Sequence, residues 1–98
     1  MRLLPHEAEA IRAAVREVFG PTARIRLFGS RAHDDLRGGD IDLFVEVEPG
    51  QASIANEQRL RDRLAPAVED LRTDVILHER GAAFTPLERI ALRDGVPL

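Results

Sequence analysis

The stretch from Asp40 to Glu48, DIDLFVEVE, alternates between two kinds of side chain. Because neighbouring side chains of a β-strand point to opposite faces, its aliphatic residues share one face and its charged residues share the other. The aliphatic set is Ile41, Leu43, Val45 and Val47. A face of this kind has to be covered, so we expect a sheet with helices packed on its aliphatic side.

The rest of the chain supplies those helices and two more strands. Apolar spacing, glycine and proline positions and alternation predict the order α, β, short α, β, α, β, α. The expected ranges are helix 5–19, strand 23–28, short helix 31–36, strand 40–48, helix 51–65, strand 72–79 and helix 86–94, which Gly95 follows. The apolar residues of the helix over 51–65 are Ile54, Leu60 and Leu64. In the last helix Thr85 is the expected N-cap, with Glu88 completing a capping box. We therefore predict an α/β (α+β) fold, a small mixed sheet of about three strands flanked by about four helices.

Length and composition narrow the class of protein. The chain has 98 residues and 44% apolar content, so we expect a single domain spanning residues 1–98. It has no cysteine, which excludes disulfides and thiolate metal sites. A net charge of −3 argues against binding nucleic acid mainly by phosphate neutralisation. No window resembles a membrane span or a signal peptide, so a cytoplasmic location is expected.

Asp40 and Asp42 lie on one face of the predicted strand, with backbones about 6.6 Å apart. Two unit negative charges about 6 Å apart repel by roughly 3 kcal/mol at an effective dielectric near 20, so something should offset this repulsion. Mg²⁺ prefers oxygen ligands and usually takes one or two protein carboxylates. Asp74 begins a later strand and is the natural third carboxylate if the two strands are neighbours in the sheet. The pattern predicts a metal site at Asp40, Asp42 and Asp74.

Gly29, Ser30 and Arg31 lie between a strand and a predicted helix, shortly before the aspartates. Glycine lets the backbone approach a triphosphate, serine and the helix N-H groups can bond its oxygens, and arginine can neutralise its charge. Taken alone, a Gly-Ser turn is more often a plain turn, and an Asp-x-Asp pair is more often a solvated strand edge. Together they favour a metal and nucleotide site, and so nucleotidyl transfer.

The segment LFGSRAHDDLRGGDIDLFV, residues 27–45, resembles the signature of the minimal nucleotidyltransferases of the polymerase beta superfamily. The resemblance covers nearly the whole chain and implies a polymerase-beta-like nucleotidyltransferase fold. It implies that Gly29 and Ser30 hold the triphosphate, with Arg31 following in the usual G-S-R order. It also implies that Asp40 and Asp42 bind Mg²⁺, and that Asp74 helps activate the attacking hydroxyl.

Two departures from the family pattern are visible. Gly39 stands where members often carry serine, and Asp34 and Asp35 make the connecting segment unusually acidic. Neither departure removes a predicted ligand, although acidic residues near the entrance would weaken binding of a polyanionic nucleotide.

Larger relatives carry a second domain that binds the acceptor, whereas we expect a single domain here. The resemblance therefore implies that the acceptor site comes from a partner polypeptide. Small relatives occur as MntA-like antitoxins paired with a HEPN-type ribonuclease toxin, to which they transfer AMP from ATP, commonly onto a tyrosine hydroxyl. The expected function is that of such an antitoxin. Two alternatives stay open: an antitoxin that neutralises its partner by binding alone, with a vestigial nucleotide site, and transfer to a small molecule through a separate acceptor subunit.

The remaining charged residues are expected to be ordinary surface groups. His33 lies in a polar connector and His78 ends a strand, where we expect a surface histidine rather than an acid-base group or metal ligand. Glu46 and Glu48 are expected to be solvated or to face an arginine-rich partner. A further set is expected on the outer face of its helix: Arg59, Arg61 and Arg63.

Overall fold

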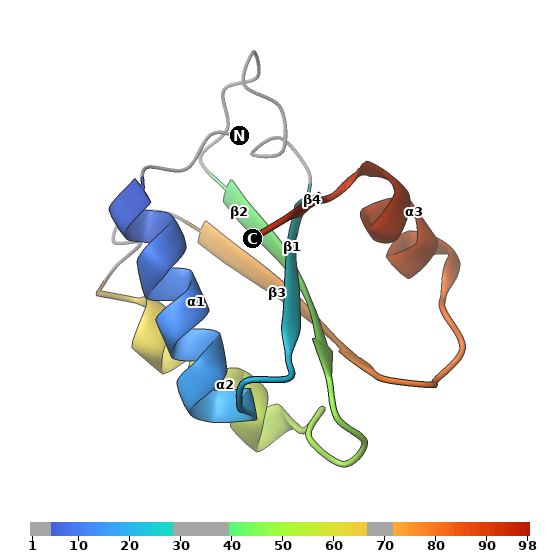
Figure 1. Ribbon diagram of the computed structural model, residues 1–98, viewed down its shortest axis with the longest axis horizontal. Helices are drawn as coiled ribbons and strands as arrows, with labels where there is room; N and C mark the ends of the chain where they lie inside the picture. Colours follow the sequence, from blue (N-terminus) through green and yellow to red (C-terminus); the bar gives the residue numbers. More distant parts are fainter. Residues whose placement is uncertain (1–4, 29–39, 67–71) are drawn as a thin grey trace.

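The computed structural model describes residues 5–28, 40–66 and 72–98 (Figure 1). Its elements, in chain order, are α1 (Pro5–Phe19), β1 (Arg24–Phe28), β2 (Asp40–Val47), α2 (Ile54–Leu64), β3 (Arg72–Glu79), α3 (Pro86–Asp94) and β4 (Val96–Pro97). The short helix predicted over 31–36 lies outside the described residues. Each of the other predicted helices and strands is present, with ends that agree to within a few residues.

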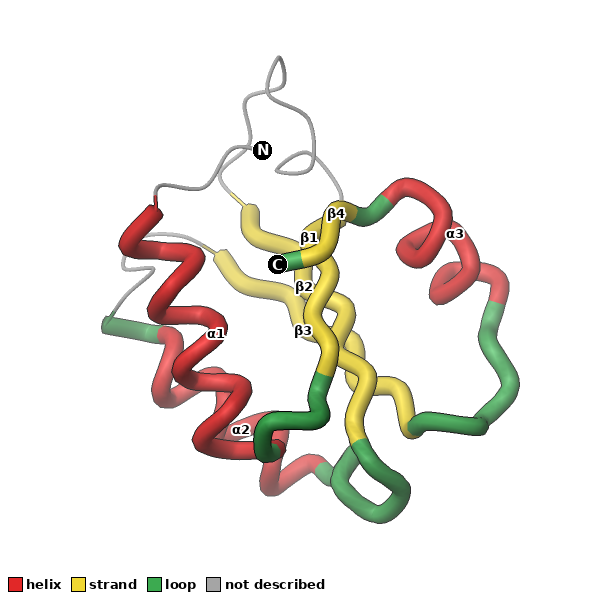
Figure 2. The backbone as a smooth tube through the Cα atoms, viewed as in Figure 1, coloured by secondary structure: helices red, strands yellow, loops and turns green. Residues whose placement is uncertain are grey.

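The strands form one mixed sheet in the order β3-β2-β1-β4. The central pair β1 and β2 is antiparallel, β2 and β3 are parallel, and β4 runs antiparallel to β1. The tube in Figure 2 follows these four strands through the middle of the molecule. The predicted α/β fold with a mixed sheet is therefore confirmed.

Strand β4 was not predicted from the sequence, because it has only two residues, too few for a visible alternation. Its placement depends on Gly95, which caps α3 and leads directly into the strand. A Cβ atom at this position would collide with the carbonyl oxygen of Ala91 and lie 3.3 Å from the Cβ of Arg26. Glycine therefore allows α3 to turn sharply back against β1.

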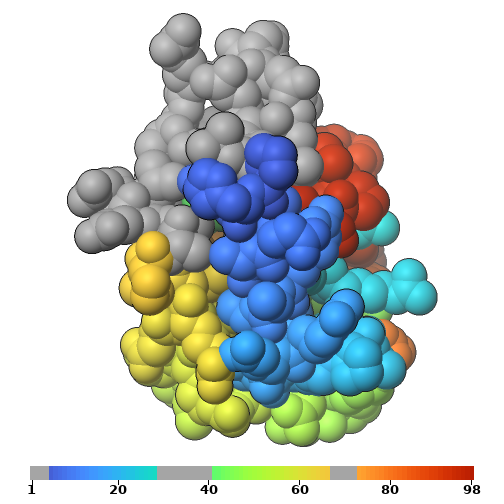
Figure 3. Space-filling model, turned by 60° about the vertical axis from the view of Figure 1, so that its left-hand side comes forward, coloured from blue at the N-terminus to red at the C-terminus, as the bar shows by residue number. Residues whose placement is uncertain are grey.

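The main core lies between the sheet and the helices α1 and α2. The four aliphatic side chains of β2 predicted to face this side have no solvent exposure at all: Ile41, Leu43, Val45 and Val47. They join one cluster with residues of α1 and α2 such as Ile11, Val15 and Leu60. Figure 3 shows the two helices, blue and yellow, packed next to each other, and an ion pair from Arg63 to Glu17 links them.

Helix α2 begins later than predicted, at Ile54 rather than Gln51. Ser53 is its N-cap, and the serine hydroxyl accepts a hydrogen bond from the backbone N–H of Asn56. As the first residue of the helix, Ile54 lies off the core face and is 90% exposed, whereas Leu60 and Leu64 are buried as expected. Within the described part of the chain, no helix has the length and apolar character to cross a membrane.

The opposite face of the sheet is partly covered by α3 (Figure 1). The predicted capping box is present: Thr85 Oγ1 accepts from the N–H of Glu88, and the Glu88 carboxylate accepts from the N–H of Thr85. Ala91, one turn further along the helix, is fully buried. Helix α3 therefore shields one end of this face and leaves the other end to polar side chains.

Candidate functional site

The candidate site lies on the face of the sheet opposite α1 and α2. The registers between neighbouring strands place one set of residues on this face: Arg24, Arg26 and Phe28 from β1, Asp42, Phe44 and Glu46 from β2, and Asp74, Ile76 and His78 from β3. Polar and apolar side chains thus follow one another along each strand.

Asp42 and Asp74 are direct partners in the parallel register of β2 and β3. Neighbouring strands lie about 4.8 Å apart, and aligned residues point to the same face, so the two carboxylates emerge side by side. Asp42 is half-buried, and Asp74 is exposed. Residues 32 positions apart in the chain are therefore brought together by strand pairing, on a part of the face that solvent can reach.

The other predicted site residues are only partly described. Asp40 begins β2, where its backbone lies opposite Arg72 of β3, but its side chain lies outside the described part of the structure. Gly29, Ser30 and Arg31 also fall outside it. They follow β1 directly, and the last residue of β1, Phe28, is the register partner of Asp42. The roles assigned to all of these residues remain predictions.

A divalent metal ion suits the two described carboxylates. Hard cations such as Mg²⁺ take oxygen ligands and need only one or two protein carboxylates, with water and substrate oxygens filling the other positions. In residues 5–28, 40–66 and 72–98 no group of three histidine, cysteine or acidic side chains is gathered in a metal-binding arrangement. Asp42 and Asp74 fit a metal as two of its ligands, because they are aligned on neighbouring strands and two protein carboxylates are enough for Mg²⁺.

His78 is not the surface residue that the sequence led us to expect. It is 3% exposed, because its ring stacks between Phe44 and Phe84, with centroids 5.8 and 4.2 Å away. Its Nδ1 lies 3.2 Å from a carboxylate oxygen of Glu88 in α3. The prediction was wrong because position 78 shares a face with Phe44, which is itself buried under α3. The position of His78 on the same face of the sheet as this aromatic residue was the signal that could have indicated its burial.

Glu88 connects this aromatic stack to the start of α3. Burial by itself would raise the pKa of Glu88, but hydrogen bonds from the Thr85 N–H and from His78 outweigh it, so the pKa lies below its usual value. The glutamate also lies in the first turn of the helix, where negative charge is favoured. Glu88 and His78 therefore fix the start of α3 against the sheet, on the same face as the candidate site.

The other charged residues form contacts within the chain. Arg80 pairs with Glu48 and, at 3.5 Å, with Glu46, and it donates to the carbonyl of Thr22 at 2.9 Å. Arg61, expected on the outer face of α2, instead donates to the carbonyl of Thr73 in β3. These contacts hold the elements around the sheet together. The partner contact considered for Glu46 and Glu48 stays a prediction.

The comparison with known families supplies the remaining finding. A family model described as a nucleotidyltransferase domain matches residues 8–95, almost the whole chain. No curated protein matches the chain significantly. The matched region begins within α1 and ends just after α3, and it includes the aspartate pair at Asp42 and Asp74.

Proposed function

The chain belongs to the nucleotidyltransferase domain family, and from this premise we propose that it transfers AMP from ATP, with Mg²⁺, to a hydroxyl of a partner protein. The observation that carries the proposal is the alignment of Asp42 with Asp74 on the open face of the sheet. Nucleotidyl transfer needs acidic oxygens to hold a metal and to take a proton from the attacking hydroxyl. This face offers both in one place.

Each residue has a distinct part in the proposed reaction. Asp42, with Asp40 before it in β2, holds the metal, and Asp74 shares it and accepts the proton of the acceptor hydroxyl. Gly29 and Ser30 hold the triphosphate through backbone N–H groups and the hydroxyl, and Arg31 offsets its charge. The acceptor oxygen forms a bond to the α-phosphorus as the bond to the departing pyrophosphate breaks. A bound Mg²⁺ supplies charge neutralisation at the phosphate oxygens.

The exposure of Asp74 supports an acceptor that arrives from outside this chain. A carboxylate at the protein surface can meet a hydroxyl presented by a second macromolecule, whereas a closed pocket would restrict the acceptor to a small molecule. We propose that the acceptor is a tyrosine hydroxyl of a HEPN-type ribonuclease toxin, which makes this chain the antitoxin of a toxin-antitoxin pair. Attachment of AMP to the toxin would neutralise it.

The test combines transfer and neutralisation. The purified protein is incubated with a HEPN-type ribonuclease toxin, ATP and Mg²⁺, and the intact mass of the toxin is measured. We expect the toxin to gain the mass of AMP with the wild-type protein and with Asp62→Asn, and to stay unmodified with Asp42→Asn. Asp62 is the matched control because it is an exposed aspartate of α2 that contacts Gln58.

The same variants separate the catalytic proposal from its alternative. If Asp42→Asn protein at equal expression neutralises the toxin as well as the wild type does, the chain acts by binding alone and the catalytic proposal is wrong. If wild type and Asp42→Asn protein give the same modified toxin, the aspartate pair is not the active site.

A further inference from the structure

A second candidate site lies around the outer edge of β1, away from the aspartate pair. A cleft of about 360 Å³ opens there between α1, the end of α3 and the turn that precedes β1. Four arginines line it, two from α1 and two from β1: Arg12, Arg16, Arg24 and Arg26. We call it the arginine cleft. Its volume lies within the range of protein binding pockets, about 300–1,000 Å³.

The positive charge of the arginine cleft is largely unmatched. Within residues 5–28, 40–66 and 72–98, Arg16, Arg24 and Arg26 have no hydrogen bond or ion pair from their side chains, and Arg12 pairs with Glu9 in an exposed contact. Glu46 also lines the cleft, but it pairs with Arg80. The whole chain carries a net charge of −3, so this local positive charge is opposite in sign to the net charge of the molecule.

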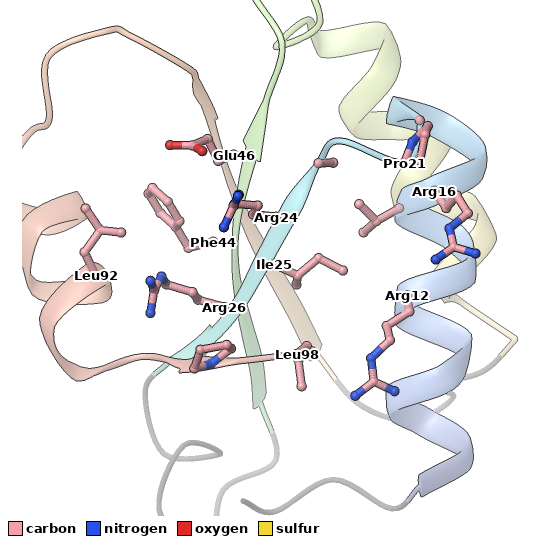
Figure 4. Close-up of a pocket in the computed structure, with 14 residues that line it drawn as sticks. Arg12, Arg16, Pro21, Arg24, Ile25, Arg26, Phe44, Glu46, Leu92 and Leu98 are labelled. Carbon is pink, nitrogen blue, oxygen red and sulfur yellow. The ribbon is translucent and has the colours of Figure 1, made fainter.

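The arginines are distributed on both sides of the sheet. Figure 4 shows Arg12 and Arg16 on the side of α1, and Arg24 and Arg26 on the side of α3, with the edge of β1 between them. Beneath the guanidinium groups the lining is apolar, with Ile25 on the first side and Phe44 and Leu92 on the second. A ligand that contacts all four arginines must therefore lie along the strand edge.

The edge of β1 is only partly paired. Strand β4 covers Arg26 and Leu27, and the last hydrogen bond along this line runs from the N–H of Leu98 to the carbonyl of Ile25, at 3.0 Å. The cleft continues along β1 beyond that bond, past Arg24 and Ala23. A chain lying there in an extended conformation would direct alternate side chains to the two faces of the sheet, where the two pairs of arginines are.

We propose that the arginine cleft binds an extended acidic segment of a protein partner. Its carboxylates pair with Arg24 and Arg26 on one side of β1 and with Arg12 and Arg16 on the other, and its apolar side chains contact the lining. Guanidinium groups bind carboxylates through paired hydrogen bonds, which suits a peptide acid. A nucleic acid is the poorer fit, because its backbone needs a broad basic surface rather than a short, partly apolar cleft. This docking is independent of the proposed transfer reaction.

The experiment measures binding of a defined probe to the full chain. A fluorescein-labelled peptide, Glu-Glu-Leu-Glu-Glu-Leu-Glu-Glu, is titrated with protein and followed by fluorescence anisotropy at low and high salt. We expect saturable binding that weakens with salt, and a loss of roughly tenfold or more in affinity for the double variant Arg24→Gln/Arg26→Gln. The α1 variant Arg12→Gln/Arg16→Gln should also weaken binding, because the peptide contacts both sides of the strand.

Controls make the result specific to the arginine cleft. Arg59→Gln, on α2 and outside the cleft, should bind the peptide as the wild type does, and circular dichroism should show all variants folded. Equal binding by the wild type and both double variants, or no binding at all, would overturn the proposal. Tighter binding of an eight-nucleotide RNA than of the peptide, with the same arginine dependence, would overturn it in favour of a nucleic-acid site. Asp42→Asn should leave peptide binding unchanged, so failure of the transfer reaction can be told apart from failure of docking.

Discussion

The two faces of β2 differ in what their side chains do, although they belong to the same eight residues. On the face toward α1 and α2, Ile41, Leu43 and Val45 are completely buried in one aliphatic cluster. On the face toward α3, Asp42 is half-buried beside Asp74, while the next residue on that face, Phe44, is buried. The first face has one environment along its length, and the second changes from polar to apolar within two residues.

From this difference we expect the covered face to determine stability and the open end of the second face to determine activity. Burying an aliphatic side chain contributes about 1.5–3 kcal/mol, so the covered face stabilises the fold. Carboxylates cannot be buried without partners, so they occupy the end of the opposite face that α3 leaves open. Substitutions on the first face should therefore change stability, and substitutions at the open end of the second should change activity. Four experiments test this division, beginning with the largest expected effect.

Leu43→Ala should cause the largest loss of stability. Leu43 is fully buried, and its truncation removes apolar contacts and leaves a cavity, at a cost of about 2–5 kcal/mol. The free energy of unfolding measured in urea would show this. Asp74→Asn, on the adjacent strand but on the other face, should change the same quantity by less than about 0.5 kcal/mol. Comparable losses for the two variants would contradict the division between the faces.

Asp74→Asn should instead reduce nucleotidyl transfer. A group that accepts the proton of the attacking hydroxyl contributes about 10²- to 10⁴-fold to the rate, and an amide cannot replace it. Initial rates of AMP transfer to the toxin, measured for wild type and variant at saturating ATP and Mg²⁺, would check this. An Asp74→Asn protein that keeps the wild-type rate would show that Asp74 has no part in the reaction.

Glu88→Gln should destabilise the protein by about 1 kcal/mol at neutral pH, because it removes the charge that contacts His78 and the start of α3. The pKa of Glu88 is lowered in the folded state, so its contribution is complete above the ordinary glutamate pKa and is lost as the pH falls through the lower, folded value. The difference in melting temperature between wild type and variant should shrink over that acidic range.

Glu57→Gln makes the same chemical change in α2, where Glu57 pairs with Arg61 in a contact that is partly open to solvent. This control should lower stability by no more than about 0.5 kcal/mol. If its effect equals that of Glu88→Gln, the contact between His78 and Glu88 does not stabilise the covered end of the second face.

Ile54→Ala should have the smallest effect. Ile54 is 90% exposed at the start of α2, so removing its side chain should change the free energy of unfolding by less than about 0.5 kcal/mol. Leu60→Ala in the same helix should cost about 2–5 kcal/mol, because Leu60 is fully buried. A large loss for Ile54→Ala would mean that this side chain is covered in solution.

Much of the fold could be predicted because it depends on local patterns. The range of α1, from Pro5 to Phe19, follows from apolar spacing and a glycine stop, and β3 follows from alternation over eight residues. The capping box at Thr85 and Glu88 depends on only four consecutive residues. The start of α2 was predicted less accurately. Ile54 fits the helical pattern whether or not its side chain meets the core, so the pattern did not show where the helix begins.

The candidate site was predictable only in its residue types. Three aspartates and a Gly-Ser turn indicate metal and nucleotide chemistry, and the match to the nucleotidyltransferase domain agrees with the general reaction. The sequence does not contain the register of β2 against β3, which depends on which strands become neighbours. His78 shows the consequence: its burial depends on α3 folding back over Phe44, a contact between distant parts of the chain.

The alternation of DIDLFVEVE by itself determined that one side of this strand must be covered, since a row of aliphatic side chains is stable only out of water. Only the tertiary structure decided that Asp42 lies beside Asp74, that a buried histidine supports α3, and that arginines from α1 and β1 meet in one cleft. The physical reason is the range of the interactions. Periodicity and capping act over a few residues, whereas strand pairing and helix docking join segments that the sequence separates.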